Sequence, residues 1–396
     1  MTSNAVDQAR GWLEREGFVL PTARPTKWVG SVLPAVLWAL DESSPMGDAR
    51  AAAAYGLEPT ANVVVLMIDG LGMAPLTDNW SYARNLRRLS SEPVLAQTTV
   101  PSTTAAALTA FTTGALPGAT RMVGYEVRRP DEHSGHTVNL LNFEDGMVPE
   151  QWQQVPTYLE RLELEANARG FHELRTAVIT KPKFQGSGLT RASFRGGQFV
   201  GRDSLEQRLD AALHGIRQAI HLQVVYWSDI DHSGHGYGVG SPKWSGKLEE
   251  LDGAVARFLA RVPSDVTVLL TADHGMVNAR ERVDIARVPV LSEGVPLIAG
   301  EGRAVHVHAT AGSEADVVER WSDYLGDRAV VVPGNRVGEL IGDGPGVDEV
   351  GAAMVFLRDR TVILDSRNQK PSVFQMVGVH GSLTFDEMAI PVWRLN

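Results

Sequence analysis

The sequence contains no cysteine among its 396 residues. This absence excludes disulfide bridges, thiol catalysis and cysteine-type zinc sites, and it leaves the redox compartment open. The chain also has no surplus of basic charge, because its formal net charge is -10 at pH 7. We therefore do not expect a nucleic acid polymer as a partner, since unspecific binding to phosphate backbones requires positive charge.

Long hydrophobic runs are absent as well. No stretch approaches the roughly 18 consecutive apolar residues of a membrane span, and residues 1–10 are polar and lack the apolar core of a signal peptide. We therefore expect a cytoplasmic protein with no membrane partner. A composition of 43% hydrophobic and 21% charged residues is ordinary for a globular protein with a large core. A small phosphorylated substrate would need local positive charge, for which bound metal is a source.

Strand and helix patterns alternate from about residue 59 onward. Apolar runs at 63–68, 176–180, 222–227 and 266–271 predict buried strands, and helical patterns at about 156–169, 204–220 and 243–260 lie between or after them. Such alternation is typical of a mostly parallel sheet that is covered on both faces. We therefore predict a three-layer α/β/α sandwich.

Three units are predicted along the chain. Residues 1–58 form an N-terminal extension with a short amphipathic helix near 5–16. Residues 277–370 carry shorter strand-like and helix-like segments, which predict a small α+β cap inserted into the chain. The catalytic α/β core then comprises residues 59–276 and 371–396.

Polar residues follow the predicted strands at their ends. Asp69 follows the run 63–68, where the alternative role is a helix cap. Asp231 and His235 lie four residues apart after the run 222–227, in what we predict to be a glycine-broken loop, with Asp229 and His232 as rival candidates. Carboxylate and imidazole groups are the ligands that divalent metals take in proteins, and a polar surface loop is the alternative interpretation.

Two further clusters have the same character. Asp273 and His274 follow the run 266–271, and neighbouring side chains on a strand point to opposite faces. Both can therefore reach one metal only beyond the end of the strand, where Gly275 permits a turn. His380 lies between glycines that permit close approach to a ligand, although a lone histidine is more often structural.

A candidate nucleophile lies in residues 100–114, where a loop is expected to enter a helix near Thr103. A threonine hydroxyl becomes nucleophilic when a metal or base lowers its pKa, and the amides of a helix N-terminus can hold phosphate oxygens. Ser102 and Thr103 are alternative helix caps. Spacing alone does not separate Thr103 from Thr104.

These clusters, in their order along the chain, resemble the motifs of the alkaline phosphatase superfamily, most of all its nucleotide pyrophosphatase/phosphodiesterase branch. The resemblance covers about residues 62–394. The segments that carry it are Ile68-Asp69-Gly70, Pro101-Ser-Thr-Thr104 with Thr113-Gly114 and Pro117, Asp231 with Ser233-Gly234-His235, Ala272-Asp-His-Gly275 and Val379-His-Gly-Ser382.

The resemblance implies a site that holds two Zn²⁺ ions, or other divalent metals. One ion is expected on residues matching Asp231, His235 and His380, and the other on those matching Asp69, Asp273 and His274 together with the nucleophile. The family's spacing between nucleophile and Thr-Gly pair selects Thr104, nine residues before Thr113. The implied activity is hydrolysis of phosphate diesters or nucleotide pyrophosphates through a covalent phosphothreonine.

The chain departs from the family where an Asn usually holds a phosphoryl oxygen, because Tyr125 stands at that position. A phenol can donate one hydrogen bond there. Lys181 and Phe184 are further candidates for substrate binding, with Lys183 beside them and a solvated turn as the alternative. The substrate is expected to be small and phosphorylated, a nucleotide being one candidate. Other hypotheses are a phosphomonoesterase, a phosphonate hydrolase or a catalytically silent metal-binding scaffold; the oligomeric state stays open.

Overall fold

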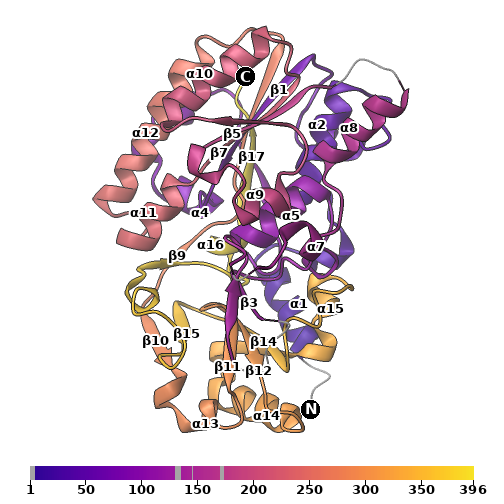
Figure 1. Ribbon diagram of the computed structural model, residues 1–396. Coiled ribbons are helices and arrows are strands. Elements are labelled where there is room, and N and C mark those ends of the chain that lie inside the picture. Colours follow the sequence, from indigo (N-terminus) through magenta and orange to yellow (C-terminus); the bar gives the residue numbers. More distant parts are fainter. Residues whose placement is uncertain (1–4, 130–134, 145, 170–173) are drawn as a thin grey trace.

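The computed structural model describes residues 5–129, 135–144, 146–169 and 174–396, with the side chains of 165–169 left out. Residues 1–4 of the predicted extension, and 130–134, 145 and 170–173 of the predicted core, lie outside the described residues. The chain forms two lobes, each built on its own sheet, one above the other in Figure 1.

The first lobe contains a seven-stranded sheet in the order β2-β17-β8-β1-β7-β5-β6. Neighbouring strands from β8 to β6 are parallel, whereas β17 runs antiparallel to both of its neighbours. The mostly parallel sheet predicted from the sequence is therefore confirmed. Its strands are β1 (Asn62–Ile68), β2 (Val94–Gln97), β5 (Thr176–Thr180), β6 (Gln198–Gly201), β7 (Leu222–Trp227), β8 (Val266–Thr271) and β17 (Ala389–Arg394).

Helices cover both faces of this sheet (Figure 1). The central strands β1, β7 and β8 are apolar and almost completely buried, as expected for a parallel sheet between two helical layers. One layer contains α10 (Leu205–Arg217), α11 (Asp229–Tyr237) and α12 (Pro242–Leu259). The other contains α2 (Val32–Leu40), α5 (Thr104–Thr113), α8 (Tyr158–Arg169) and α9 (Gly188–Ser193).

The second lobe contains a six-stranded antiparallel sheet in the order β13-β14-β12-β11-β3-β4. Its strands are β3 (Glu126–Arg128), β4 (Thr137–Asn139), β11 (Leu297–Glu301), β12 (Ala304–His308), β13 (Ala329–Pro333) and β14 (Ala353–Leu357). The helices of residues 277–370 are α13 (Pro289–Ser292), α14 (Glu314–Leu325) and α15 (Gly338–Ile341), and β10 (Glu281–Asp284) pairs with β15 (Thr361–Leu364) beside them.

Segments outside 277–370 also belong to the second lobe. Strands β3 and β4 complete its sheet, and helix α1 (Ala5–Arg15) packs on it with Trp12 and Leu13 in the same apolar cluster as Phe356. Helix α2 instead lies in the core of the first lobe. The division into an N-terminal extension, a catalytic core and an inserted cap remains a prediction, and its boundaries do not coincide with those of the two lobes.

The remaining regular elements are short. They are α3 (Ala49–Ala54), α4 (Met73–Asp78), α6 (Pro117–Thr120), α7 (Pro149–Trp152), α16 (Phe385–Met388), β9 (Val277–Asn278) and β16 (Gly378–Val379). Across the described ranges, no helix combines the length and the apolar character needed to cross a membrane.

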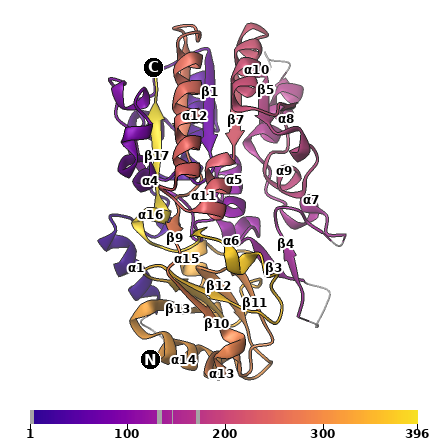
Figure 2. The same cartoon turned by 90° about the vertical axis from the view of Figure 1, so that its left-hand side faces the viewer.

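The register of the first sheet determines where its polar motifs meet. Ile68 at the end of β1 lies opposite Trp227 at the end of β7, and Met67 lies opposite Thr271 at the end of β8. The three strands therefore end level with one another, on the side of the sheet that faces the second lobe (Figure 2). The carboxyl edge of a parallel sheet is where ligands bind in open α/β folds.

Strand β12 of the second lobe contributes two buried histidines, His306 and His308. Nε2 of His306 lies 3.1 Å from the carbonyl of Val123, whereas Nδ1 of His306 and both ring nitrogens of His308 have no hydrogen-bond partner among the described residues. Burial lowers the pKa of His306 to about 4 and, with the help of His306, that of His308 to about 3. The fold therefore favours the neutral form of both rings.

This burial predicts acid sensitivity. The two histidines have pKa values near 6.5 in the unfolded chain and lower values in the folded protein. The folded state is therefore fully stable above pH 6.5, and it loses stability as the pH falls from 6.5 toward the folded pKa values, because the unfolded chain binds protons first. Each ring should lower the free energy of unfolding by about 2 kcal/mol when the pH falls from 7.5 to 5. Over this pH range, the free energy of unfolding of His308→Leu should fall by about 2 kcal/mol less than that of the unmodified protein. Urea unfolding at both pH values measures this difference. The exposed His214, replaced by Gln, is the control; an unchanged pH dependence in His308→Leu would contradict the prediction.

Candidate metal and nucleophile site

Asp69 lies immediately after β1, and its side chain is almost completely buried. Oδ2 accepts a hydrogen bond from the Tyr226 hydroxyl of β7, while Oδ1 has no hydrogen-bond partner among the described residues. The next residue, Gly70, has a positive φ of 72°, and a Cβ there would lie 3.0 Å from Cβ of Asp231. The glycine thus lets the chain turn and brings Asp69 and Asp231 close together.

Asp273 and His274 lie beyond the last residue of β8, Thr271, as predicted from strand geometry. Both side chains are fully buried. Oδ1 of Asp273 accepts hydrogen bonds from the amides of Gly70 (3.0 Å) and His274 (2.9 Å), which leaves Oδ2 free to face the site. Gly275 is needed for packing, since a Cβ there would lie 1.9 Å from the carbonyl oxygen of Asp386.

Asp231 and His235 lie on helix α11, so the predicted glycine-broken loop is wrong. The helix forms despite its glycines because Asp229 and Asp231 in its first turn complement the helix dipole, and because Gly234 packs so tightly that a Cβ would lie 2.2 Å from Sδ of Met276. The four-residue spacing then places Asp231 and His235 on one helix face, with Nε2 of His235 3.3 Å from Oδ2 of Asp231.

The three site histidines are oriented in the same way. Nδ1 of each ring lies at hydrogen-bond distance from a backbone carbonyl, at 2.8 Å for His235, 2.9 Å for His274 and 3.0 Å for His380. A carbonyl only accepts, so each Nδ1 carries a proton and each Nε2 is turned toward the site. This is the orientation in which neutral imidazole binds a metal.

Three carboxylates converge with these rings. Asp69 Oδ1, Asp231 Oδ1 and Asp273 Oδ2 are buried, and none has a hydrogen-bond partner in the part of the chain that the structure describes. Burial, reinforced by Asp273 and Asp231, raises the pKa of Asp69, and burial likewise raises the pKa of Asp273. Burial opposes ionisation of Asp231 too, but His235 outweighs it and holds the pKa of Asp231 below its usual range. Burial and the neighbouring His274 and His235 lower the pKa of His380.

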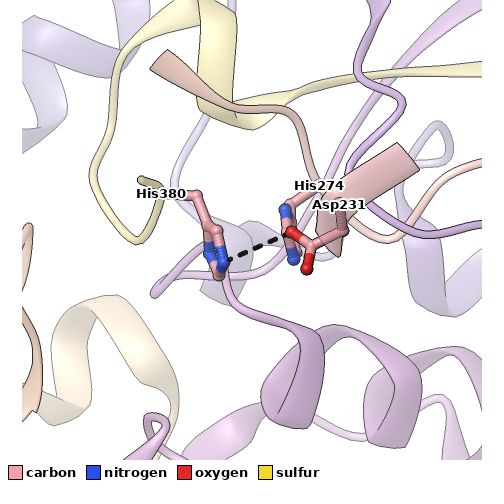
Figure 3. Close-up of side chains that lie close together, drawn as sticks. All are labelled: Asp231, His274 and His380. Carbon is pink, nitrogen blue, oxygen red and sulfur yellow. Dashed lines mark ion pairs between the residues drawn. The ribbon is translucent and has the colours of Figure 1, made fainter. Parts of the chain in front are cut away.

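Oxygens and nitrogens of these residues form two compact groups whose ligand atoms lie within 4.8 Å of one another: Asp69, Asp273 and His274, and Asp231, His274 and His380. Figure 3 shows the second group, with the contact of 3.8 Å between Nε2 of His380 and Oδ1 of Asp231. The first group is the set predicted from the sequence. In the second, His274 takes the place predicted for His235, whose ring centre lies 5.2 Å from that of His380.

Such a constellation fits cations. Unpartnered buried carboxylate oxygens are costly unless a positive charge compensates them, and ring nitrogens of His274 and His380 lie in the same compact groups as these oxygens. Carboxylate and imidazole donors together suit zinc and other divalent transition metals. The assignment of each ligand to a particular ion stays a prediction.

Thr104 is the first residue of α5, and its hydroxyl faces this cluster. Its oxygen lies 3.0 Å from Nε2 of His274. Thr103, which spacing alone did not separate from Thr104, is 1% exposed and donates its hydroxyl proton to Glu301 instead. Ser102 is bound to the carbonyl of Ser382 at 2.7 Å. Of the three hydroxyls, the geometry therefore favours Thr104 as the nucleophile.

The cluster opens into a pocket of about 470 Å³ that is lined by residues of both lobes. Tyr125, Lys181 and Phe184, predicted to contact substrate, all lie on its wall, as do Lys183 and His232. Lys181 forms an ion pair with Asp229, so that Asp229 is turned toward lysines and away from the metal cluster. Lys183 lies over the ring of Phe184 at 5.2 Å.

Two residues of the site were not predicted. Tyr226 donates its hydroxyl proton to Asp69, but in the sequence it is one aromatic residue within an apolar strand, and nothing there indicates this contact. Glu301 reaches the site from the second lobe and stands between Gly300 and Gly302 after the apolar residues of β11. That is the pattern used to find Asp69 and His380, so the same criterion would have found Glu301. Burial, together with Asp231 and Glu387, raises the pKa of Glu301.

A threonine at a helix N-terminus thus lies beside clustered carboxylates and imidazoles at the carboxyl edge of a parallel sheet. Comparison with family models matches residues 63–383 to type I phosphodiesterase/nucleotide pyrophosphatase. The chain belongs to this family.

Known structures share the fold. Murine ectonucleotide pyrophosphatase/phosphodiesterase 5 superposes with a TM-score of 0.62 at 15% identity, covering 84% of this chain and 87% of that protein. Phosphonoacetate hydrolase from Sinorhizobium meliloti superposes with a TM-score of 0.60 at 16% identity, covering 84% of this chain and 89% of that protein.

Sequence relatives match over shorter segments. A phosphopentomutase from Desulfitobacterium hafniense is 32% identical over 96 residues, which is 24% of each protein. A phosphopentomutase from Shewanella loihica is 31% identical over 126 residues, which is 31% of this chain and 29% of that protein. The matched segment thus spans about a quarter of the curated relatives.

The hydrogen bond from Tyr226 to Asp69 leads to a prediction about stability. Tyr226→Phe leaves a second buried oxygen of Asp69 without a partner, which should lower the free energy of unfolding of the metal-free protein by about 1–3 kcal/mol. Urea unfolding in the presence of a chelator measures this difference. Tyr237→Phe is the control, because Tyr237 is 58% exposed and its loss should change stability by less than about 0.5 kcal/mol. Equal stability of both variants would contradict the role given to Tyr226.

Proposed function

We propose that the protein hydrolyses phosphate diesters or nucleotide pyrophosphates, with Thr104 as nucleophile at a site for two zinc ions. The observation that carries this proposal is the position of the Thr104 hydroxyl, which lies at the N-terminus of the ten-residue helix α5 and 3.0 Å from Nε2 of His274. The family supplies the reaction class.

The residues that would hold the metals are those with free ligand atoms. Asp69, Asp273 and His274 would hold one ion beside Thr104, and Asp231, His235 and His380 the other. When bound, divalent ions supply charge that stabilises the threonine alkoxide, the phosphoryl oxygens and the leaving oxygen. His274 belongs to both compact groups of ligand atoms, so its imidazole could serve either ion.

The reaction proceeds in two displacements. The hydroxyl of Thr104 loses its proton to solvent, its Oγ1 forms a bond to phosphorus while the bond to the leaving oxygen breaks, and the leaving oxygen takes up a proton; this gives a phosphothreonine and releases the first product. A water molecule then attacks phosphorus, the bond to Oγ1 breaks, and the hydroxyl of Thr104 regains a proton. The second product is the phosphate monoester.

Backbone amides orient the phosphoryl group. The first amides of an α-helix have no acceptor within the helix, and the helix dipole favours an anion at that end. Thr104 therefore attacks a group that is held by the helix on which it lies. Tyr125 lines the pocket and would donate one hydrogen bond to the phosphoryl group where the family uses Asn.

The pocket favours a diester over a monoester. Among its described lining residues there is no arginine, the usual bidentate partner of a phosphate dianion, and the charge of Lys181 is compensated by Asp229. A diester carries one negative charge and a second organic group. Phe184, Leu189 and Met376 offer that group an apolar wall.

The ligands bound by structurally similar proteins suggest which substrates to test first. The murine ectonucleotide pyrophosphatase/phosphodiesterase 5 has been solved as an inactive threonine-to-alanine variant in complex with AMP. A nucleotide is accordingly our first choice of substrate, and phosphonates are the second, because the neighbouring hydrolase binds phosphonoacetate. A cytoplasmic location remains our expectation from the sequence.

A substrate comparison tests the reaction class. We expect the zinc-loaded protein to hydrolyse bis-p-nitrophenyl phosphate at least about tenfold faster, in kcat/KM, than p-nitrophenyl phosphate, because the apolar wall of the pocket contacts the second organic group that only the diester has. Chelation should abolish both activities and zinc should restore them. A preference for the monoester would indicate a phosphomonoesterase, and a zinc-loaded protein without turnover of either would indicate the silent scaffold.

Removal of the nucleophile tests the mechanism. Thr104→Ala should lower kcat by at least about a thousandfold while two zinc ions still bind, because the other ligands remain. Thr104→Ser should recover part of the activity, since it keeps a hydroxyl. Rapid acid quench followed by mass spectrometry of peptides should detect phosphate on residue 104 of the unmodified protein. Full activity in Thr104→Ala would overturn the assignment.

A further inference from the structure

The hairpin that joins β11 to β12 extends from the second lobe into the site. Its tip contains Glu301, Gly302 and Arg303, and the side chain of Glu301 is 9% exposed. Every metal-ligand candidate belongs to the segments of the first lobe or to the loop around His380. Glu301 is thus a buried carboxylate that the second lobe adds to the site.

Both oxygens of Glu301 contact residues beside the metal cluster. Oε1 accepts a hydrogen bond from the hydroxyl of Thr103, the residue before the proposed nucleophile. Oε2 lies 3.2 Å from Nδ1 of His380, on the side of the ring opposite the metal-facing Nε2. The carbonyl of Ser102 lies 3.0 Å from the same Nδ1. The hydrogen bond of Nδ1 to the carbonyl of Ser102 fixes its proton, and the Glu301 side chain lies directly beside it, so both groups hold the ring with Nε2 toward Asp231.

The hairpin tip is held firmly in place. Arg303, next to it, forms a fully buried pair with Glu387, at 2.7 Å through both Nε and Nη2. Arg303 also donates to the carbonyls of Thr361 (2.8 Å) and Leu357 (3.0 Å). Oε1 of Glu387 accepts from the amide of Ser382, two residues after His380, at 3.0 Å. The same pair thus anchors the hairpin and the loop that carries His380.

We propose that Glu301 is a positioning residue that orients His380 and thereby sets the affinity of the metal site formed with Asp231. A carboxylate on the far nitrogen of a ligand histidine fixes the ring and makes the metal-facing nitrogen more basic. The effect belongs to one of the two ions, because Glu301 contacts neither Asp69, Asp273 nor His274 in the described contacts. This inference rests on the proposed metal site.

Zinc binding to the metal-free protein tests it. Titration in competition with a fluorescent zinc chelator should resolve two ions on the unmodified chain. Glu301→Ala should weaken one of them by about 10–100-fold and leave the other unchanged. Glu301→Gln should weaken the same ion less, because its side chain has the same size and keeps an oxygen beside Nδ1 of His380, although it carries no charge. In turnover of the diester, the loss should appear in kcat at limiting zinc and shrink at saturating zinc.

Glu126→Gln is the matched control. Glu126 is a half-buried carboxylate at the same pocket, where it accepts a hydrogen bond from Thr137. Both zinc affinities should be unchanged in this variant. Cooperative unfolding of metal-free Glu301→Gln, measured by circular dichroism, verifies that it is folded.

The outcomes distinguish the two proposals. If the unmodified protein binds no zinc, the proposed function fails. If it binds two ions and the Glu301 variants bind both with unchanged affinity, the role of Glu301 is overturned while the proposed function stands. Equal weakening of both ions would also overturn it, because that result indicates a general loosening of the fold.

Discussion

The structure depends on the convergence of three buried carboxylates, those of Asp69, Asp231 and Asp273. Each leaves one buried oxygen without a hydrogen-bond partner in the described chain, and their charges repel one another. Hydrogen-bond donors reach the other oxygen of two of these carboxylates. The hydroxyl of Tyr226 donates to Asp69, and the amides of Gly70 and His274 donate to Asp273. The inward-facing oxygens are left for a cation. The repulsion explains why so much of the surrounding backbone is committed to holding these side chains.

The parallel sheet makes that convergence possible. Because β1, β7 and β8 are adjacent and end level with one another, the residues that follow them meet at one edge although about 200 residues separate the first from the last. The strands themselves are apolar and buried, so their positions are fixed by packing and not by the polar residues. The stability of the sheet therefore offsets the cost of assembling like charges beside it.

Much of this arrangement was predictable because local patterns encode it. Apolar runs identified the central strands, and polar residues at their ends identified Asp69, Asp231 and Asp273. The helix that carries Asp231 and His235 was not predicted, because its glycines suggest a loop and the packing of Gly234 against Met276, which is distant in the sequence, is not visible in a local pattern. The same limit applies to β3 and β4, which join a sheet whose other strands lie more than 150 residues further along the chain.

Glu301 shows why the second lobe is part of the site and not an appendage to it. Its hairpin brings a carboxylate to His380 and Thr103, and Arg303 fixes the hairpin to Glu387 in the C-terminal segment. A displaced second lobe would take Glu301 away from the ring of His380, leave the carbonyl of Ser102 as the partner of Nδ1, and open the pocket wall. Metal binding and the shape of the substrate pocket are therefore coupled through one short hairpin. The ion pair joins Arg303 and Glu387, and the segment between these two residues builds most of the second lobe. Glu387 also accepts a hydrogen bond from the amide of Ser382, so both ends of this segment are attached to the loop that carries His380.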